Sequence, residues 1–225
     1  DPFGDDYWYD SDVFNKVEVG GVALEWNREL ANEGTVTFLN AWRFYESDSV
    51  FDGDFTAYNA SDTTTFVELD QYSSELRYTS PAGETIDYQG GLYYYYSEFD
   101  SVGTFTQFEP LVNNVLVVGD LTLGDFFPDG TLNTDTNLYT TTSLAAFGQA
   151  TWNVTDALSF TVGLRYTHEK KEREGSQITE PTSFIDIPPV AGPDITYDDE
   201  RTDTDVSPTF NVRYFFNPDL MVYAT

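Results

Sequence analysis

Side chains that could carry out chemistry are scarce in this sequence, although acidic residues are abundant. The 225 residues contain one histidine and no cysteine, so disulfide frameworks and cysteine-based metal sites are excluded. The histidine, His168, is followed by Glu169 and Lys170, and no serine is arranged beside it as a nucleophile. Among 39 acidic residues, pairs of carboxylates arise by chance and do not indicate general acid–base catalysis. We therefore expect no enzyme, with no catalytic residue and no cofactor.

A calcium-binding loop is the nearest approach to a metal-site motif. Residues 133–137 (Asn-Thr-Asp-Thr-Asn) have its early spacing, but the sixth position lacks glycine and Leu144 stands where a bidentate glutamate is required. The segments 52–54 (Asp-Gly-Asp) and 203–205 (Asp-Thr-Asp) are similarly incomplete. We assign no metal ligand, and calcium bridging among acidic loops is a hypothesis motivated by the charge density.

The charge balance limits the classes of partner. Acidic residues outnumber the 10 basic ones, and the formal net charge is −29. Nucleic acid is excluded as a partner because phosphate binding needs clustered Lys and Arg. The acidity could favour cationic or metal-bearing ligands, or keep an exposed protein soluble in a salty habitat. We favour the second interpretation because the charge is spread over every long loop. The aromatic content of 17% indicates that the chain folds.

The elements that would position any site are β-strands. Residues 143–167 contain two runs in which apolar and polar side chains alternate, separated by the polar segment 153–156. Such alternation places one set of residues on each face of a strand, so this stretch predicts a hairpin. The same pattern recurs along the chain and predicts eight strands, at about 17–27, 35–45, 66–79, 86–99, 143–152, 158–169, 206–216 and 220–225.

The connections between these strands alternate between short and long. Tight turns are expected at 29–34, 80–84, 153–157 and 216–219, and long acidic loops at 46–65, 100–142 and 168–205. In an antiparallel meander every second connection lies at the same end, so all the long loops share one end. Outer-membrane β-barrels have short periplasmic turns and long extracellular loops. We therefore expect an all-β antiparallel meander of about eight transmembrane strands. The alternative is a soluble β-sandwich, whose loops vary irregularly in length at both ends.

No apolar run approaches the length of about 20 residues that a transmembrane helix needs, but transmembrane strands escape this test because only alternate residues face lipid. The predicted lipid-facing residues are Leu76, Tyr78, Tyr88, Leu92, Tyr94, Leu158, Phe160, Val162, Leu164, Tyr166, Phe210, Val212 and Tyr214. The predicted lumen-facing residues are Arg43, Glu75, Arg77, Gln149, Arg165 and Arg213. The strand arginines with Glu25 and Glu75 predict a ladder of opposite charges along the lumen. The Tyr-rich run at 93–96 suits an interfacial girdle.

Several phrases resemble those of TonB-dependent outer-membrane receptors. FGQATWNVTDALSFTVGLRYTHEKK is similar to a mid-barrel hairpin of that family, as is VSPTFNVRYFFNPDLMVYAT. SSELRYTSPAGETIDYQGGLYYYY and WNRELANEGTVTFLNAWRFYESDSVFDGDF resemble the two hairpins upstream. The resemblance covers most of residues 20–225, in the expected order.

This resemblance implies a 22-stranded barrel in the bacterial outer membrane, closed by a plug and energised by the TonB complex for uptake of a scarce nutrient such as an iron-siderophore. Neither a plug nor a TonB-interacting segment is recognised in residues 1–225, so we expect a partial barrel domain. Its expected partners are outer-membrane lipid, the remaining strands and plug of the same receptor, the TonB complex through that plug, and a small-molecule or metal-chelate ligand. A closed eight-stranded outer-membrane barrel with a structural or adhesive role is the alternative. The ligand itself cannot be read from the sequence.

Overall fold

The protein is built of β-strands. The computed structural model describes residues 12–53, 61–107, 116–118, 121–122, 131–180 and 194–225. Its strands are β1 (Phe14–Glu29), β2 (Thr35–Asp52), β3 (Ser61–Thr79), β4 (Ile86–Gln107), β5 (Leu116–Val118), β6 (Leu121–Thr122), β7 (Thr131–Asn153), β8 (Leu158–Glu180), β9 (Ile195–Asn217) and β10 (Leu220–Ala224). Among these described residues, no helix is long and apolar enough to cross a membrane.

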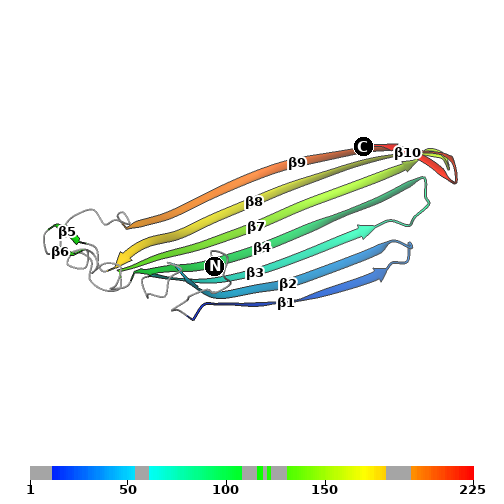
Figure 1. Cartoon of the computed structure of the whole chain (residues 1–225). Helices are drawn as coiled ribbons and strands as arrows, with labels where there is room; N and C mark the ends of the chain where they lie inside the picture. Colours follow the sequence, from blue (N-terminus) through cyan, green and yellow to red (C-terminus); the bar gives the residue numbers. More distant parts are fainter. Residues whose placement is uncertain (1–11, 54–60, 108–115, 119–120, 123–130, 181–193) are drawn as a thin grey trace, which may run out of the picture.

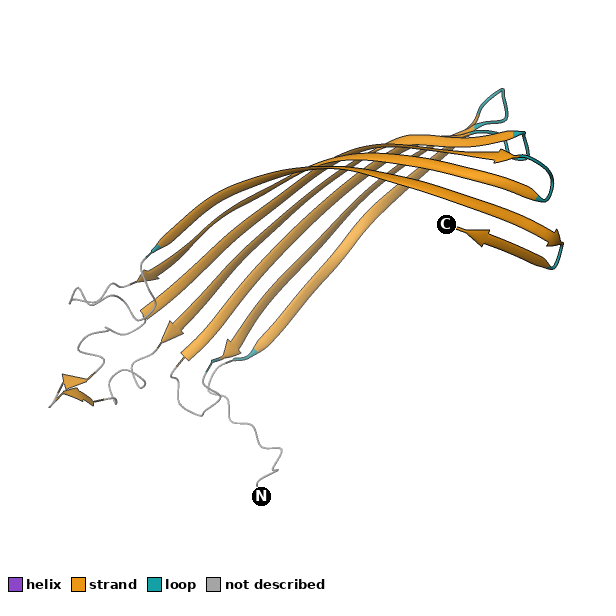
Figure 2. Ribbon diagram, turned by 90° about the horizontal axis from the view of Figure 1, so that it is seen from above, coloured by secondary structure: helices purple, strands orange, loops and turns teal. Residues whose placement is uncertain are grey.

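Eight of the strands form a single antiparallel meander. Their order is β1-β2-β3-β4-β7-β8-β9-β10, while β5 pairs only with β6. Figures 1 and 2 show a twisted, curved sheet whose long strands run side by side, with β1 at one edge and the short β10 at the other. The two edge strands do not pair with each other, so the sheet is open. The closure that an eight-stranded barrel requires is therefore not formed.

The tight turns hold one end of the sheet in register. Glu33 adopts a φ of 62° in the turn after β1, where the amide of Leu30 donates to the carbonyl of Gly34 at 2.8 Å. In the turn after β3, Gly83 has a φ of 88°, a conformation that glycine adopts without a steric penalty. The side-chain amide of Asn153 donates to the Glu84 carbonyl at 2.8 Å, which joins two successive turns. These bonds satisfy polar groups where the strand ladders end.

The three long connections are shorter than the sequence predicted. The first runs from the end of β2 at Asp52 to the start of β3 at Ser61. The second runs from Gln107 of β4 to Thr131 of β7, and the third from Glu180 of β8 to Ile195 of β9. The loop predictions at 46–65, 100–142 and 168–205 were therefore wrong in extent. Apolar and polar residues stop alternating in these segments, but Thr-rich sequence with high β propensity continues, and the ladders continue with it.

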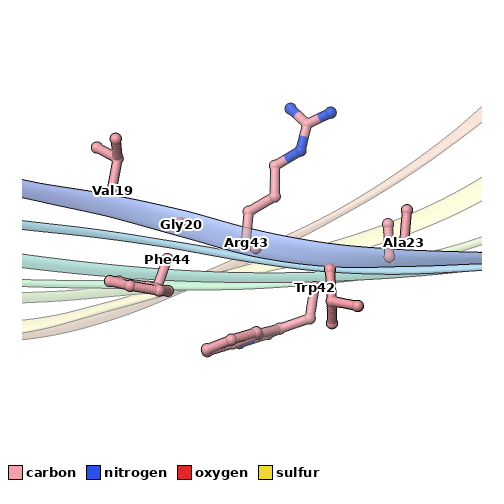
Figure 3. Close-up of a pocket in the computed structure, with 9 residues that line it drawn as sticks. Val19, Gly20, Ala23, Trp42, Arg43 and Phe44 are labelled. Carbon is pink, nitrogen blue, oxygen red and sulfur yellow. The ribbon is translucent and has the colours of Figure 1, made fainter.

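The register divides the side chains of the large sheet into two sets. Every directly paired couple from β1 to β9 joins two even-numbered or two odd-numbered residues, for example Val162 with Phe210 and Arg165 with Ser207. Paired residues share one face of a sheet. We call these the even face and the odd face. Figure 3 shows the division on β2, where Arg43 projects to one side and Trp42 and Phe44 to the other.

The buried core of the described residues is small. Ala145 is the only buried hydrophobic residue among them, with 6% of its surface exposed, and Ser143 and Ser159 are also buried on the same face. Large apolar side chains are instead exposed, including Leu92 at 60% and Phe210 at 56%. A single curved layer of this kind leaves most of its apolar surface open to its surroundings.

Candidate functional site: the two faces of the sheet

The even face carries an apolar band at the end of the sheet that holds the tight turns. In residues 86–96, 144–152, 158–166 and 206–216, every even-numbered side chain is apolar, aromatic, glycine, alanine or proline. We call these four segments the belt. Each spans nine or eleven residues, and a transmembrane strand needs about nine to eleven. The belt therefore has the length of one bilayer crossing on four consecutive strands.

Charged and polar residues begin immediately beyond the belt on the same face. In β8 the even positions after Tyr166 are His168, Lys170, Glu172 and Glu174, and in β4 Tyr96 is followed by Glu98 and Asp100. We call residues 97–107, 131–142, 167–180 and 195–205 the extension. The change from apolar to charged side chains along one face indicates a change of surrounding medium along the strands.

All thirteen residues that the sequence predicted to face lipid lie on the even face. They come from β3, β4, β8 and β9, and the register brings them onto one continuous surface. Aromatic rings also lie against one another on this surface. The rings of Phe160 and Phe210 stack with centroids 6.4 Å apart, Trp152 lies 6.3 Å from Phe160, and Tyr72 lies 6.0 Å from Tyr94.

All six residues that the sequence predicted to face the lumen lie on the odd face. One cross-strand row on this face contains Arg77, Gly91, Phe147 and Arg165. A Cβ on Gly91 would lie 2.7 Å from Cζ of Phe147, so the ring occupies the space above the glycine. The Arg165 guanidinium lies 5.3 Å from the Tyr93 ring centre and 5.9 Å from that of Phe147. The centre of the odd face is therefore an aromatic and arginine surface.

The predicted ladder of opposite charges is not formed in the described residues. Glu75 pairs with Arg77 at 3.5 Å, but Glu25 accepts a hydrogen bond from Asn27 at 2.6 Å instead of contacting an arginine. Arg165 and Arg213 lie against rings, the latter 5.3 Å from the ring centre of Phe215. These rings include Phe147 of the strand next to Arg165 and Phe215 of the same strand as Arg213. A cation–π contact needs no desolvated carboxylate.

The odd face of the extension carries a second arginine and aromatic cluster. The Arg173 guanidinium lies 4.0 Å from the ring centre of Tyr197 and 5.4 Å from that of Tyr139. The Tyr197 hydroxyl donates to the side-chain oxygen of Asn137 and to the Thr136 carbonyl. Tyr139 falls in the loop predicted at 100–142, but in the structure it is part of β7.

Charge pairs cover the extension on both faces. On the even face Lys170 contacts Glu172 at 2.6 Å and Glu200 at 3.1 Å. The hydrogen bonds to Glu172 and then to Glu200 raise the pKa of Lys170 above its ordinary value of 10.5. On the odd face Lys171 contacts Glu169 at 2.9 Å and Arg201 contacts Asp203 at 2.8 Å. The extension is therefore a polar, ion-paired sheet on its two sides.

Two of the three segments that approached calcium-loop spacing lie within strands, and of the third, 52–54, Asp52 ends β2, Gly53 follows it, and residue 54 lies outside the described residues. Residues 133–137 lie within β7, with Asn133, Asp135 and Asn137 on one face of the strand, and residues 203–205 lie within β9. No group of three or more His, Asp or Glu side chains that could hold a metal ion occurs in the part of the chain that the structure describes. His168 lies on the exposed even face of β8.

One concave feature of the odd face was missed from the sequence. A hollow of about 200 Å³ lies over β2, β3 and β4, lined by Arg43 together with Gln71, Tyr93 and Tyr95. The Tyr-rich run had been assigned as a whole to an interfacial girdle, but Tyr93 and Tyr95 lie on the odd face and Tyr94 and Tyr96 on the even face. The alternation of a strand contained this signal, because four consecutive tyrosines must be shared equally between two faces.

Solved structures with a similar fold are uptake and import receptors by name. The ferric yersiniabactin uptake receptor FyuA from Yersinia pestis matches with a TM-score of 0.69 at 16% identity, over 95% of this chain and 28% of that chain. The ferric-catecholate import receptor Fiu from E. coli K12 matches in its open form with a TM-score of 0.53 at 13% identity, over 96% of this chain and 36% of that chain. Its closed form matches with a TM-score of 0.55 at 14% identity, over 96% and 33%.

The chain thus spans roughly a third of the length of the receptors whose fold it shares. None of the curated proteins matches the sequence. The family model described as TonB dependent receptor-like, beta-barrel, matches residues 1–225, which is the whole chain. The eight-stranded meander and this match agree on an all-β receptor wall, and the chain belongs to the TonB-dependent receptor β-barrel family.

Proposed function

We propose that this chain is part of the wall of a bacterial outer-membrane receptor that takes up a scarce nutrient with energy from the TonB complex. The observation that carries the proposal is the belt on the even face, with its length of one bilayer crossing and its sharp border with charged residues. The backbone groups of a transmembrane sheet must all be paired. The open edges at β1 and β10 therefore require further strands of the same receptor.

In this proposal the even face meets lipid and the odd face lines the lumen. The even face contributes Leu164, which is 55% exposed, to a surface that water would not favour, whereas lipid offers it an apolar contact. The odd face carries the arginines of β2, β3, β8 and β9. The ring contacts of Arg165 and Arg213 leave guanidinium N–H groups available to a plug or to a ligand.

We propose a ferric chelate as the cargo class. FyuA is a ferric yersiniabactin uptake receptor and Fiu a ferric-catecholate import receptor by name, and this chain shares their fold over almost all of its own length. The aromatic and arginine clusters around Arg165 and Arg173 suit an anionic chelate with aromatic groups, because cations and ring faces can both contact it.

The test uses cells that lack the receptor containing this chain and cells in which it is restored. Radiolabelled iron is supplied as a panel of ferric siderophores, with and without a protonophore. Restoration is expected to increase uptake of at least one chelate, and the protonophore is expected to abolish the increase. Extraction of the receptor without detergent, or a lack of any chelate-dependent uptake, would contradict the proposal.

A further inference from the structure

The hollow over β2, β3 and β4 has a floor of small residues and polar walls. Ala41 and Ser73 are directly paired on the odd face, and their short side chains leave the space open. The space is about 200 Å³, whereas a pocket for a whole small ligand measures about 300 to 1,000 Å³. The hollow therefore has room for one functional group of a larger molecule or for one side chain.

Arg43 stands at this hollow without an acidic neighbour. Its directly paired residues are Gly21 and Gln71, and the next odd-face residues of its own strand are Ala41 and Tyr45. It makes no ion pair with the residues that the structure describes. Arg165, Arg173 and Arg213 also make no ion pair in the described residues, but they lie against aromatic rings, whereas Arg43 has no ring contact there. Figure 3 shows its guanidinium extended away from the ribbon of the sheet.

The glycine opposite Arg43 makes room for this arrangement. A Cβ on Gly21 would lie 3.2 Å from Cγ of Arg43 and 2.5 Å from the Trp42 carbonyl oxygen. The stem of the arginine therefore passes over a position that no side chain fills. This leaves the planar guanidinium exposed, with its fork of N–H donors unoccupied by the wall.

The other walls of the hollow add hydrogen-bond donors. Gln71 donates from Nε2 to the Tyr95 hydroxyl at 3.0 Å, so the hydroxyl proton of Tyr95 remains available for another acceptor. Tyr93 also lines the hollow, and its hydroxyl makes no hydrogen bond within the described residues, while Arg165 lies against its ring at 5.3 Å. A guanidinium and two phenolic hydroxyls form a set of donors that matches an anionic acceptor.

From this geometry we infer that the hollow is a carboxylate-binding site, with Arg43 as the charged hydrogen-bond donor and Tyr93 and Tyr95 as neutral donors. Bidentate pairing with a carboxylate is the strongest use of an arginine fork, and the hollow is of a size for that one group. The inference rests on the proposed function, because it places the odd face in the lumen. The carboxylate can belong to a solute that enters the lumen or to a segment of the receptor that fills it.

The experiment uses the complete receptor that contains this chain, purified in detergent, with sodium succinate as the probe. Sodium chloride at equal ionic strength is the salt control. The thermal unfolding midpoint is measured for the native receptor, Arg43→Gln, Arg43→Lys and the matched control Arg28→Gln, which removes an exposed even-face arginine. Arg43→Lys keeps the charge and loses the fork, so it should retain only part of any effect.

Two results would support the site, and they distinguish a carboxylate of a solute from a carboxylate of the receptor itself. If succinate raises the midpoint saturably in the native receptor and Arg43→Gln needs at least about tenfold more succinate, the site takes a solute carboxylate. If succinate has no effect, and Arg43→Gln lowers the midpoint while Arg28→Gln does not, the carboxylate comes from the receptor itself. Arg43 makes no hydrogen bond, ion pair or ring contact with the described wall whose loss could mimic the second result, and a glutamine keeps the Cβ and Cγ atoms that lie over Gly21.

The inference is overturned if succinate acts equally on the native receptor and Arg43→Gln, or if it does nothing and Arg43→Gln unfolds like Arg28→Gln. Its failure can be told apart from failure of the proposed function by the uptake assay. Chelate-dependent iron uptake without any Arg43 effect removes only the carboxylate site. Succinate binding that depends on Arg43 in a receptor with no energised uptake removes only the proposed function.

Discussion

The belt and the extension are parts of the same strands, yet their side chains obey different rules. In β8 the belt residues 158–166 alternate between apolar and polar, whereas residues 168–180 carry charge on both faces. The ladder of β7 and β8 continues through both regions without a change of register. The backbone is therefore the same in the two regions. The difference in their side chains indicates a difference in the surrounding medium.

The largest expected effect comes from placing the same charge in each region. Val162→Arg puts a cation on the even face in the middle of the belt, and it should cost about 2 to 4 kcal/mol of stability in lipid. The measurement is urea unfolding of the receptor reconstituted in lipid vesicles.

The matched control for that charge is Thr140→Arg on the even face of the extension. Thr140 is directly paired with Glu98 on one side and Glu172 on the other. An arginine there gains two acidic neighbours, so the change should be neutral or slightly stabilising. Equal destabilisation by both arginines would contradict the division between belt and extension.

Two glycines of β4 test how tightly each region is packed. A Cβ at Gly91 would lie 2.5 Å from the Leu76 carbonyl oxygen and 2.7 Å from the Phe147 ring, whereas Gly103 has no atom within 4 Å of that position. Gly91→Ala should therefore cost about 1 to 3 kcal/mol, and Gly103→Ala should be tolerated. The unfolding midpoints of the two variants give the comparison, and equal midpoints would show that the ring does not occupy the space above Gly91.

A smaller effect is expected from the arginine and aromatic cluster of the extension. Arg173→Met removes the cation from the Tyr197 ring, 4.0 Å away, and should cost about 0.5 to 1 kcal/mol. Faster amide hydrogen exchange in residues 135–140 and 195–199 would reveal the loss, while residues 158–166 should exchange as before. Uniformly faster exchange would mean that the cluster stabilises the whole sheet and not only the extension.

The smallest effect is a pH dependence of the extension. The pKa of Lys170 is raised by Glu172 and Glu200, so its contribution is complete below the ordinary lysine value of 10.5 and disappears as pH rises through the raised value. Proteolysis of the strand ends at 168–180 should increase above that pH. Lys170→Met should remove this increase in proteolysis at high pH. If the variant shows the same increase, the pH dependence belongs to other groups.

The strands of the belt could be predicted from sequence because one face of each is apolar and the other polar. Leu158, Phe160, Val162, Leu164 and Tyr166 alternate with polar residues, and the structure places them together on one face. The extension could not be delimited in this way. Where both faces are polar, alternation carries no signal, and only the β propensity of residues such as Thr140, Thr141 and Thr142 remains.

The odd-face residues could be assigned to a face but not to their partners. The strand pattern predicts that Arg165 and Arg213 lie on the odd face. Their contacts with Tyr93 and Phe215 depend on side-chain rotamers, and Tyr93 belongs to a strand two positions away in the sheet. The hollow at Arg43 depends on β2, β3 and β4, on the short side chains of Ala41 and Ser73, and on the glycine at position 21 of β1. Such a combination is set by register, which a single sequence does not specify.

The central claim, that the even face of the belt meets lipid, is tested most directly by spin labels. The chain contains no cysteine, so single cysteines at Val162, Thr161 and Glu174 are the only labelling sites within it, and any cysteine elsewhere in the receptor is replaced by serine. In reconstituted receptor, the account predicts that the label at Val162 collides with oxygen far more than with a water-soluble nickel chelate. The labels at Thr161 and Glu174 should favour the chelate. Equal access of the chelate to Val162 and Glu174 would contradict the account.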